Sequence, residues 1–175
     1  VKGADIVHIT LRDDESVDEV LKSAEAGLKP GAVIIDHTTT SVEGAITRTK
    51  AWKTKGFTYL HAPVFMGPPN ALESTGYMLV SGDQDVIKKA GPELSNMTGK
   101  LLNLGDVEGK AAGMKLAGNL FLQVMTVGIS DMLALAKGLG ISGAEVQGLF
   151  SEWNPAAAMP ARLKRILSGN FEQPS

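Results

Sequence analysis

The chain has 175 residues with a formal net charge of −2, which suits one large domain or two small ones. It lacks the basic blocks and basic–aromatic stripes of a nucleic-acid binder. Without cysteine, disulfides and thiolate metal sites are excluded, and a reducing compartment such as the cytoplasm is expected. Because no unbroken run of about 18 apolar residues occurs, we expect no membrane span.

The first 63 residues predict strands that alternate with helices. Short apolar or β-branched runs favour strands at 6–11, 32–35 and 57–62. Helical spacing begins near Ser16, a candidate N-cap, and a second helix is expected from about 41 to 55. This alternation is typical of a parallel sheet covered on both faces. Residues 1–5 resemble a helix end entering a strand, so we expect the chain to begin inside a domain.

The next segment continues the α/β pattern after an interruption. Residues 63–76 contain three prolines and predict a loop. Strands are expected at 77–81 and 100–104, with a helix between them at 83–97. Pro92 lies near the middle of that helix, so we expect a kink or a break there.

The character of the chain changes near residue 108, where we place a domain boundary. Residues 109–138 predict one long helix rich in Ala, Leu and Met, and shorter helices are expected at 143–152 and 156–168. The fold class is therefore α/β for residues 1–108, followed by an all-α domain over 109–175. Residues 170–175 do not resemble a domain terminus, so we expect the chain to stop inside a domain as well.

The long helix is apolar on nearly every side, which favours burial in a core or a subunit interface. Its polar side chains gather in a stripe about 80° wide at about 100° per residue; they are Lys115, Asn119, Gln123, Thr126 and Ser130. One interpretation is a solvated stripe with Lys115 as a snorkelling surface lysine. The other is a cleft wall, in which partial burial lowers the lysine pKa and suits it to proton transfer.

Residues 109–119, with sequence GKAAGMKLAGN, resemble the catalytic helix of the β-hydroxyacid dehydrogenases. That family includes 3-hydroxyisobutyrate dehydrogenase, tartronate semialdehyde reductase, glyoxylate reductase and 6-phosphogluconate dehydrogenase. The resemblance implies that Lys115 is the general acid/base and that Asn119 binds substrate. It also implies a homodimer or homotetramer, because the long helix of the family packs between subunits. Ala111 and Gly118 depart from the family pattern, which has a glycine and an asparagine there.

Two loops extend the resemblance to the cofactor. Residues 36–41, DHTTTS, follow a strand at the edge where ligands of parallel sheets bind, although a plain polar turn explains them equally well by themselves. They are similar to the family motif Asp-x-Ser-Thr-x-x-Pro, which places the nicotinamide-contacting threonine at Thr39. Leu11 occupies a family cofactor-contacting position and is expected to act through its backbone. Its neighbour Arg12 is equally well read as a surface charge.

A third loop resembles the family's substrate loop, Asp-Ala-Pro-Val-Ser-Gly-Gly, with HAPVFMG at 61–67. The resemblance assigns substrate binding to Phe65, Met66 and Gly67, the last through its backbone. Phe65 and Met66 replace the Ser-Gly pair and His61 replaces the aspartate. Because phenylalanine and methionine offer apolar bulk in place of a hydroxyl donor, a larger or more apolar substrate than a small hydroxy acid is expected.

Residues 138–143, GLGISG, match the dinucleotide-binding pattern G-x-G-x-x-G but follow a helix in place of a strand. We interpret Gly138 or Gly140 as a helix C-cap. The family's own fingerprint would lie upstream of residue 1, so the resemblance implies NADP or NAD without selecting one. The three histidines, at 8, 37 and 61, show no metal-ligand spacing, and no metal is expected.

Together these features predict an NAD(P)-dependent oxidoreductase that moves hydride between a nicotinamide and a small-molecule 3-hydroxy acid or semialdehyde. An imine reductase is the alternative within enzymes, although the retained Lys115 argues against it. A non-catalytic fragment that dimerises through the helical half is the alternative outside enzymes.

Overall fold

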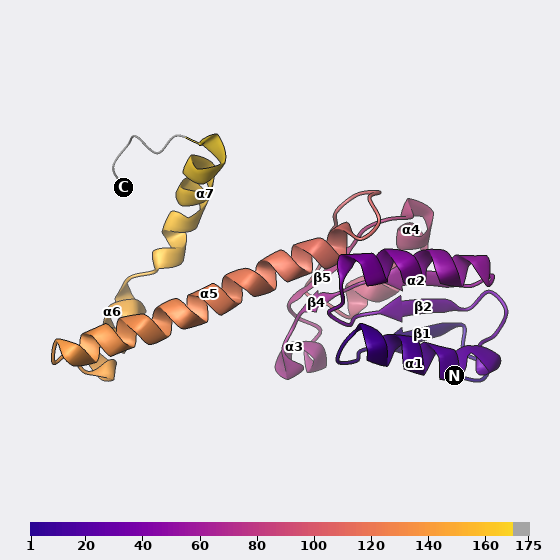
Figure 1. Cartoon of the computed structure of the whole chain (residues 1–175), viewed down its shortest axis with the longest axis horizontal. Coiled ribbons are helices and arrows are strands. Elements are labelled where there is room, and N and C mark those ends of the chain that lie inside the picture. Colours follow the sequence, from indigo (N-terminus) through magenta and orange to yellow (C-terminus); the bar gives the residue numbers. More distant parts are fainter. Residues whose placement is uncertain (170–175) are drawn as a thin grey trace. The chain divides into compact units, whose positions relative to one another are not determined.

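The structure, a computed structural model, describes residues 1–169 (Figure 1). It consists of two compact units, Val1–Phe121 and the chain from Leu122 onward, and each is described by itself. The division falls inside helix α5 (Lys110–Gly138), and the domain boundary expected near residue 108 stays a prediction. The expectation for residues 170–175 lies outside the described residues.

The first unit contains two three-stranded sheets. In the first, β1 (Ile6–Ile9), β2 (Val33–Asp36) and β3 (Thr58–His61) lie parallel in the order β1-β2-β3. In the second, β4 (Val64–Phe65) pairs antiparallel with β5 (Tyr77–Val80), which lies parallel to β6 (Lys100–Asn103). Parallel pairing is thus confirmed for β1-β2-β3 and for β5-β6, whereas β4 and β5 are antiparallel.

Helices connect these strands as the alternation predicts. Those of the first unit are α1 (Asp14–Ala24), a 3₁₀ turn (Glu25–Gly27), α2 (Val42–Thr54), α3 (Pro68–Leu72) and α4 (Gln84–Asn96). After α5 come α6 (Gly143–Glu152), a 3₁₀ turn (Pro155–Ala158) and α7 (Met159–Ser168).

Three local expectations are corrected. The segment 63–76 is not a plain loop, because it contains β4 and α3. Asp13, not Ser16, caps α1: its carboxylate accepts the Ser16 backbone N–H at 2.9 Å. Helix α4 runs through Pro92 without a break, since buried side chains on both sides of the proline, Ile87 and Leu94, hold the two halves in one core.

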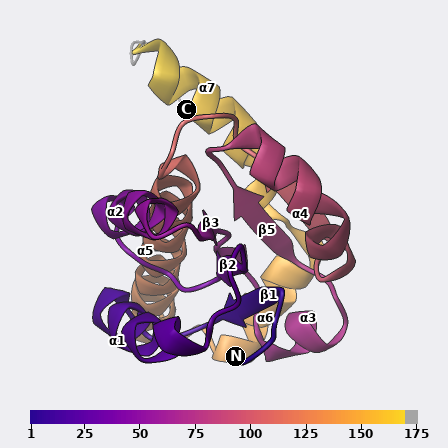
Figure 2. The ribbon, with the colours of Figure 1, turned by 90° about the vertical axis from the view of Figure 1, so that its right-hand side faces the viewer.

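Each face of the first sheet is covered, as expected. One core lies between the sheet and helices α1 and α2, with side chains such as Val17, Ile34 and Trp52. The other lies between the sheet and α4, with Ile35 and Leu60. Ile34 and Ile35 face opposite ways because side chains alternate along a strand. Figure 2 shows α1 and α2 on one side of the strands and α4 on the other.

Helix α5 is apolar but exposed along much of its length. Leu120 is 67% exposed and Leu135 is 65% exposed. By length and composition α5 is also the single helix within residues 1–169 that could cross a membrane, contrary to the expectation from the sequence. One such helix is weak evidence, because helices that pack in a core or against another subunit meet the same criterion.

Candidate active site

The loops after β1 and β2 are tied together at the carboxyl edge of the parallel sheet. The Leu11 backbone N–H donates to Thr38 Oγ1 at 2.9 Å. The Thr38 N–H in turn donates to Asp36 Oδ1 at 2.9 Å. Both residues predicted to contact the cofactor, Leu11 and Thr39, are half-buried at this edge. Since the N–H of Leu11 already donates to Thr38, the backbone contact expected there falls to the Leu11 carbonyl.

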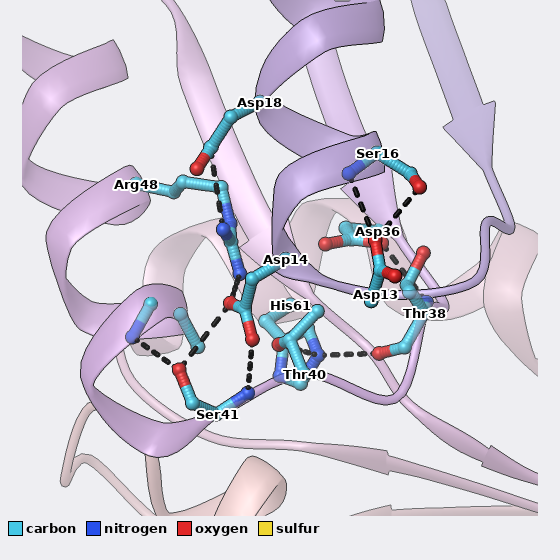
Figure 3. A network of polar contacts seen from close by, with 12 residues as sticks. Asp13, Asp14, Ser16, Asp18, Asp36, Thr38, Thr40, Ser41, Arg48 and His61 are labelled. Atoms are coloured by element: carbon cyan, nitrogen blue, oxygen red, sulfur yellow. Dashed lines mark hydrogen bonds and ion pairs between the residues drawn. The ribbon is translucent and has the colours of Figure 1, made fainter.

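A buried polar network holds the loop 36–41 in place (Figure 3). Asp36 is fully buried, and its Oδ2 accepts the Tyr59 hydroxyl at 2.5 Å. Arg48 Nε donates to the same hydroxyl oxygen at 3.1 Å. The phenol is therefore both donor and acceptor between a carboxylate and a guanidinium. Burial and the Asp36 charge raise the pKa of Tyr59, with Arg48 opposing them, so the hydroxyl stays protonated.

Arg48 carries the network on to α1 and to the start of α2. Its guanidinium pairs with Asp14 and, at 3.2 Å, with Asp18. The other Asp14 oxygen accepts the backbone N–H of Ser41 at 2.9 Å, and Ser41 itself caps α2. Burial opposes ionisation of Asp14, but the hydrogen bonds from Ser41 and Arg48 outweigh it and lower its pKa. The loop 36–41 is thus fixed at both ends.

The sequence analysis did not identify Arg48 or Tyr59 as part of the site. A lone arginine in a helix of mixed composition is normally a surface residue, and its partners lie 30 and 34 residues away. No local signal in the sequence indicates this burial.

Lys115 is buried on the first turns of α5, with 8% of its surface exposed. Its ammonium nitrogen lies 4.1 Å from the centre of the Phe65 ring. Burial lowers the pKa of Lys115 below its usual range. The interpretation as a snorkelling surface lysine is therefore wrong, and a partly desolvated lysine suited to proton transfer is what the structure contains.

The predicted substrate residues divide between two places. Phe65 faces Lys115, and Asn119, one turn after the lysine, is half-buried. Met66 and Gly67 instead line a cavity of about 410 Å³ whose lining does not include Lys115. The side chains of Phe65 and Met66 separate because successive residues of an extended segment face opposite ways.

The structure also tests three other expectations from the sequence, on the polar stripe of α5, on Arg12 and on the glycines after α5. The hydroxyls of Thr126 and Ser130 bond to carbonyls four residues earlier in α5, which satisfies them inside the helix. Arg12 is an exposed surface charge paired with Asp13. Gly138 ends α5 and Gly140 has a φ of +76°, which confirms a helix C-terminus in place of a dinucleotide-binding turn.

The histidines take part in hydrogen bonds of the first unit. His37 Nδ1 donates to the Ala62 carbonyl at 2.8 Å. The other ring nitrogen of His37, Nε2, lies 3.0 Å from His8 Nδ1. His61 Nε2 donates to the Thr38 carbonyl at 2.9 Å, so this histidine supports the loop 36–41. Across residues 1–169, no group of three or more His, Asp or Glu side chains is arranged to hold a metal.

Residues 1–105 match the family described as the NAD binding domain of 6-phosphogluconate dehydrogenase. The chain belongs to this family. A probable 3-hydroxyisobutyrate dehydrogenase of Mycobacterium bovis is 31% identical over 150 residues, which cover 86% of this chain and 50% of the relative. The chain thus spans about half the length of this curated relative.

Two solved structures agree with this assignment. The 3-hydroxyisobutyrate dehydrogenase of Mycobacterium tuberculosis with L-serine is 28% identical, with a TM-score of 0.75 over 88% of this chain and 53% of that chain. An imine reductase of Myxococcus stipitatus in complex with NADP+ is 18% identical, with a TM-score of 0.86 over 99% of this chain and 63% of that chain. At that identity the second likeness shows the fold alone.

The two residues predicted to contact a nicotinamide cofactor lie where the chemistry of such a ligand would need them. Leu11 and Thr39 are half-buried at the carboxyl edge of a parallel sheet, where such ligands bind, and the network below holds their loops in place. Within the described residues no G-x-G-x-x-G turn follows a strand, so the phosphate cradle of a dinucleotide is not built by this part of the chain.

Proposed function

We propose that the protein carrying this chain is an NAD(P)-dependent oxidoreductase that interconverts a 3-hydroxy acid or related alcohol and its carbonyl form. The observation that carries the proposal is Lys115, a buried lysine with a lowered pKa on the helix that resembles the family's catalytic helix. Family membership and the relatives named as 3-hydroxyisobutyrate dehydrogenases support the reaction class.

The cofactor, NAD or NADP, would supply the chemistry of hydride transfer. Lys115 as the ammonium gives a proton to the carbonyl oxygen during reduction, while the carbonyl carbon gains the hydride and the C=O π bond breaks. During oxidation the neutral amine takes the hydroxyl proton. Asn119 lies one turn further along α5, where its amide is in reach of the same oxygen. Leu11 and Thr39 border the cofactor side.

Substitution of Lys115 tests this role in the full-length protein. Lys115→Ala should lower kcat for semialdehyde reduction by at least about a hundredfold, the loss typical of a missing general acid. Lys115→Arg should not restore it, because arginine keeps its proton near neutral pH. Lys110→Ala, which removes an exposed lysine of the same helix, is the control and should leave the rate unchanged.

The pH profile gives a second readout. Because reduction needs the ammonium form, kcat should fall as pH rises through the Lys115 pKa, which burial places below the usual value of 10.5. Wild-type rates in Lys115→Ala would remove the lysine from the mechanism and leave a nucleotide-binding fold without an assigned reaction.

Imine reduction is a second candidate, favoured by the fold likeness to the imine reductase of Myxococcus stipitatus. The buried Lys115 favours carbonyl chemistry instead, since an amine of lowered pKa is suited to exchanging a proton with a hydroxyl. Assay of cyclic imines beside semialdehydes with both cofactors decides between them. A non-catalytic role is tested by titrating NADPH into this chain and into the full-length protein; binding by neither supports it.

We also propose a cytoplasmic homodimer or homotetramer that associates through α5. The exposed apolar side chains along this helix support association over a long surface, including Leu120, Val124, Val127 and Leu135. Sedimentation of the full-length protein in buffer without detergent tests it, and an apolar helix that instead requires detergent for solubility would favour a membrane role.

A further inference from the structure

The short strand β4 separates the two residues that were expected to act together on the substrate. Its pairing with β5 sets Val64 opposite Met78 and Phe65 opposite Tyr77. Val64 and Met66 line the 410 Å³ cavity, together with His37. Phe65 points the other way, toward α5, and its ring faces the Lys115 ammonium. Only one of the two apolar replacements therefore borders the catalytic lysine.

Gly118 makes room for this ring. It lies three residues after Lys115, on the same side of α5. A Cβ built on Gly118 would lie 2.8 Å from Cε1 of Phe65 and nearer still to Cζ, and Cβ atoms essentially never approach other atoms within 3.0 Å. The Phe65 ring thus occupies the volume that any side chain at position 118 would need.

The remaining glycines of this part of α5 make no such contact. A Cβ on Gly113 would meet Val42 at 3.6 Å, an ordinary van der Waals distance. Gly118 also has no positive φ, so a helix would accept alanine there if the ring were absent. The three atoms nearest to a Cβ at 118 all belong to the Phe65 ring, which therefore sets the requirement for glycine there.

We propose that Phe65, whose ring packs against Gly118, is a specificity-determining residue. It selects aldehydes that carry an alkyl or aryl group over semialdehydes whose chain ends in a carboxylate. The proposal rests on the proposed function, since it concerns the substrate of the same lysine. An aromatic ring offers apolar surface and no hydrogen-bond donor to a carboxylate. Its face holds the ammonium on one side through a cation–π contact. A carboxylate packed against this ring would lose water without gaining a hydrogen bond from position 65, whereas an alkyl or aryl group there is buried without that cost.

The ring contact can be measured in this chain without any substrate. Lys115 should show upfield-shifted Hε proton resonances, because the Nζ bonded to Cε lies over the Phe65 ring, 4.1 Å from its centre. Phe65→Leu should remove the shift while keeping apolar bulk. Gly118→Ala should remove it by displacing the ring, and Gly113→Ala, the matched control on the same helix, should preserve it. A shift that persists in Gly118→Ala would overturn the coupling of the two residues.

The preference is measured in the full-length protein by kcat/KM for straight-chain and aryl aldehydes against ω-carboxy semialdehydes of equal length. We expect the wild type to favour the apolar series, and Phe65→Ser to reduce the ratio by about tenfold or more, within the range for one apolar contact. Gly118→Ala should act in the same direction, and Gly113→Ala should not. An unchanged ratio in Phe65→Ser would overturn the specificity role.

The outcomes also distinguish this proposal from the function on which it rests. If Lys115→Ala abolishes turnover but Phe65→Ser leaves the ratio unchanged, the acid/base role stands and the specificity role is wrong. If neither aldehyde series is turned over in a Lys115-dependent way, the proposed function fails and the substrate class fails with it. The ring-current shift reports the Phe65–Lys115 contact in either case.

Discussion

Tyr59→Phe removes one oxygen atom from the middle of the buried network and leaves the ring in place. The lost hydroxyl donates to Asp36 at 2.5 Å and accepts from Arg48 at 3.1 Å. After the substitution, the Asp36 carboxylate still accepts the Thr38 backbone N–H through Oδ1. Arg48 keeps its two carboxylate partners on α1. The substitution therefore removes a hydrogen bond chiefly from Asp36, a fully buried carboxylate.

The expected cost follows from these contacts. A hydrogen bond to a charged group contributes about 1.5–3 kcal/mol, and more is lost where the remaining partner is buried. With two such bonds removed, we expect a loss of about 3–6 kcal/mol in the free energy of unfolding. Against a typical domain stability of about 5–15 kcal/mol, this is a large fraction.

Urea unfolding measures the cost. The chain has two tryptophans, so a Trp153→Phe background leaves Trp52, which packs in the same core as Tyr59, as the single reporter. With a slope of about 2 kcal/mol per molar urea, the midpoint should fall by about 1.5–3 M. Tyr77→Phe is the control, because Tyr77 is 50% exposed and should change stability by no more than about 0.5 kcal/mol. A loss below about 1 kcal/mol for Tyr59→Phe would refute the network as a support of the loop 36–41.

Two further predictions concern stability. Burial lowers the pKa of His37 and His61, so below the usual value of 6.5 the unfolded chain binds protons that the folded chain does not. The urea midpoint should therefore be constant above that pH and fall below it. A midpoint that does not change with pH down to about pH 5.5 would contradict this. Gly76 has a φ of +81° and no room for a Cβ beside the Phe65 carbonyl, so Gly76→Ala should lower Tm. Gly91→Ala, in open space on α4, should raise Tm slightly. Equal changes in Tm would show that the turn before β5 is unstrained.

Much of the fold could be predicted because its signals are local. The apolar or β-branched runs at 6–11, 32–35 and 57–62 contain β1, β2 and β3, and the long Ala- and Leu-rich segment forms α5. The interpretation of Lys115 as a cleft lysine also came from a local pattern, the polar stripe on an apolar helix, and its burial agrees. The strand β4 was missed, since two residues carry no periodicity.

The arrangement around the site depends on contacts between distant residues, which one sequence does not reveal. Arg48 is buried because Asp14, 34 residues earlier, and Tyr59 meet it in space. Substrate binding by Phe65 and Met66 stays a prediction, but the structure places their side chains on different sides of the segment. Neighbours in a strand face opposite sides, so residues adjacent in a motif need not be adjacent in a site.

The contact between Phe65 and Gly118 has a consequence for how this site can evolve. Neither position can change freely: a side chain at 118 is tolerated only after the ring at 65 has gone, and the ring can arise only where 118 is already glycine. The order of the two substitutions is therefore constrained, with the loss of a side chain at 118 coming first on the way to this pair. Homologues that keep the lysine should rarely combine phenylalanine at the first position with anything other than glycine at the second.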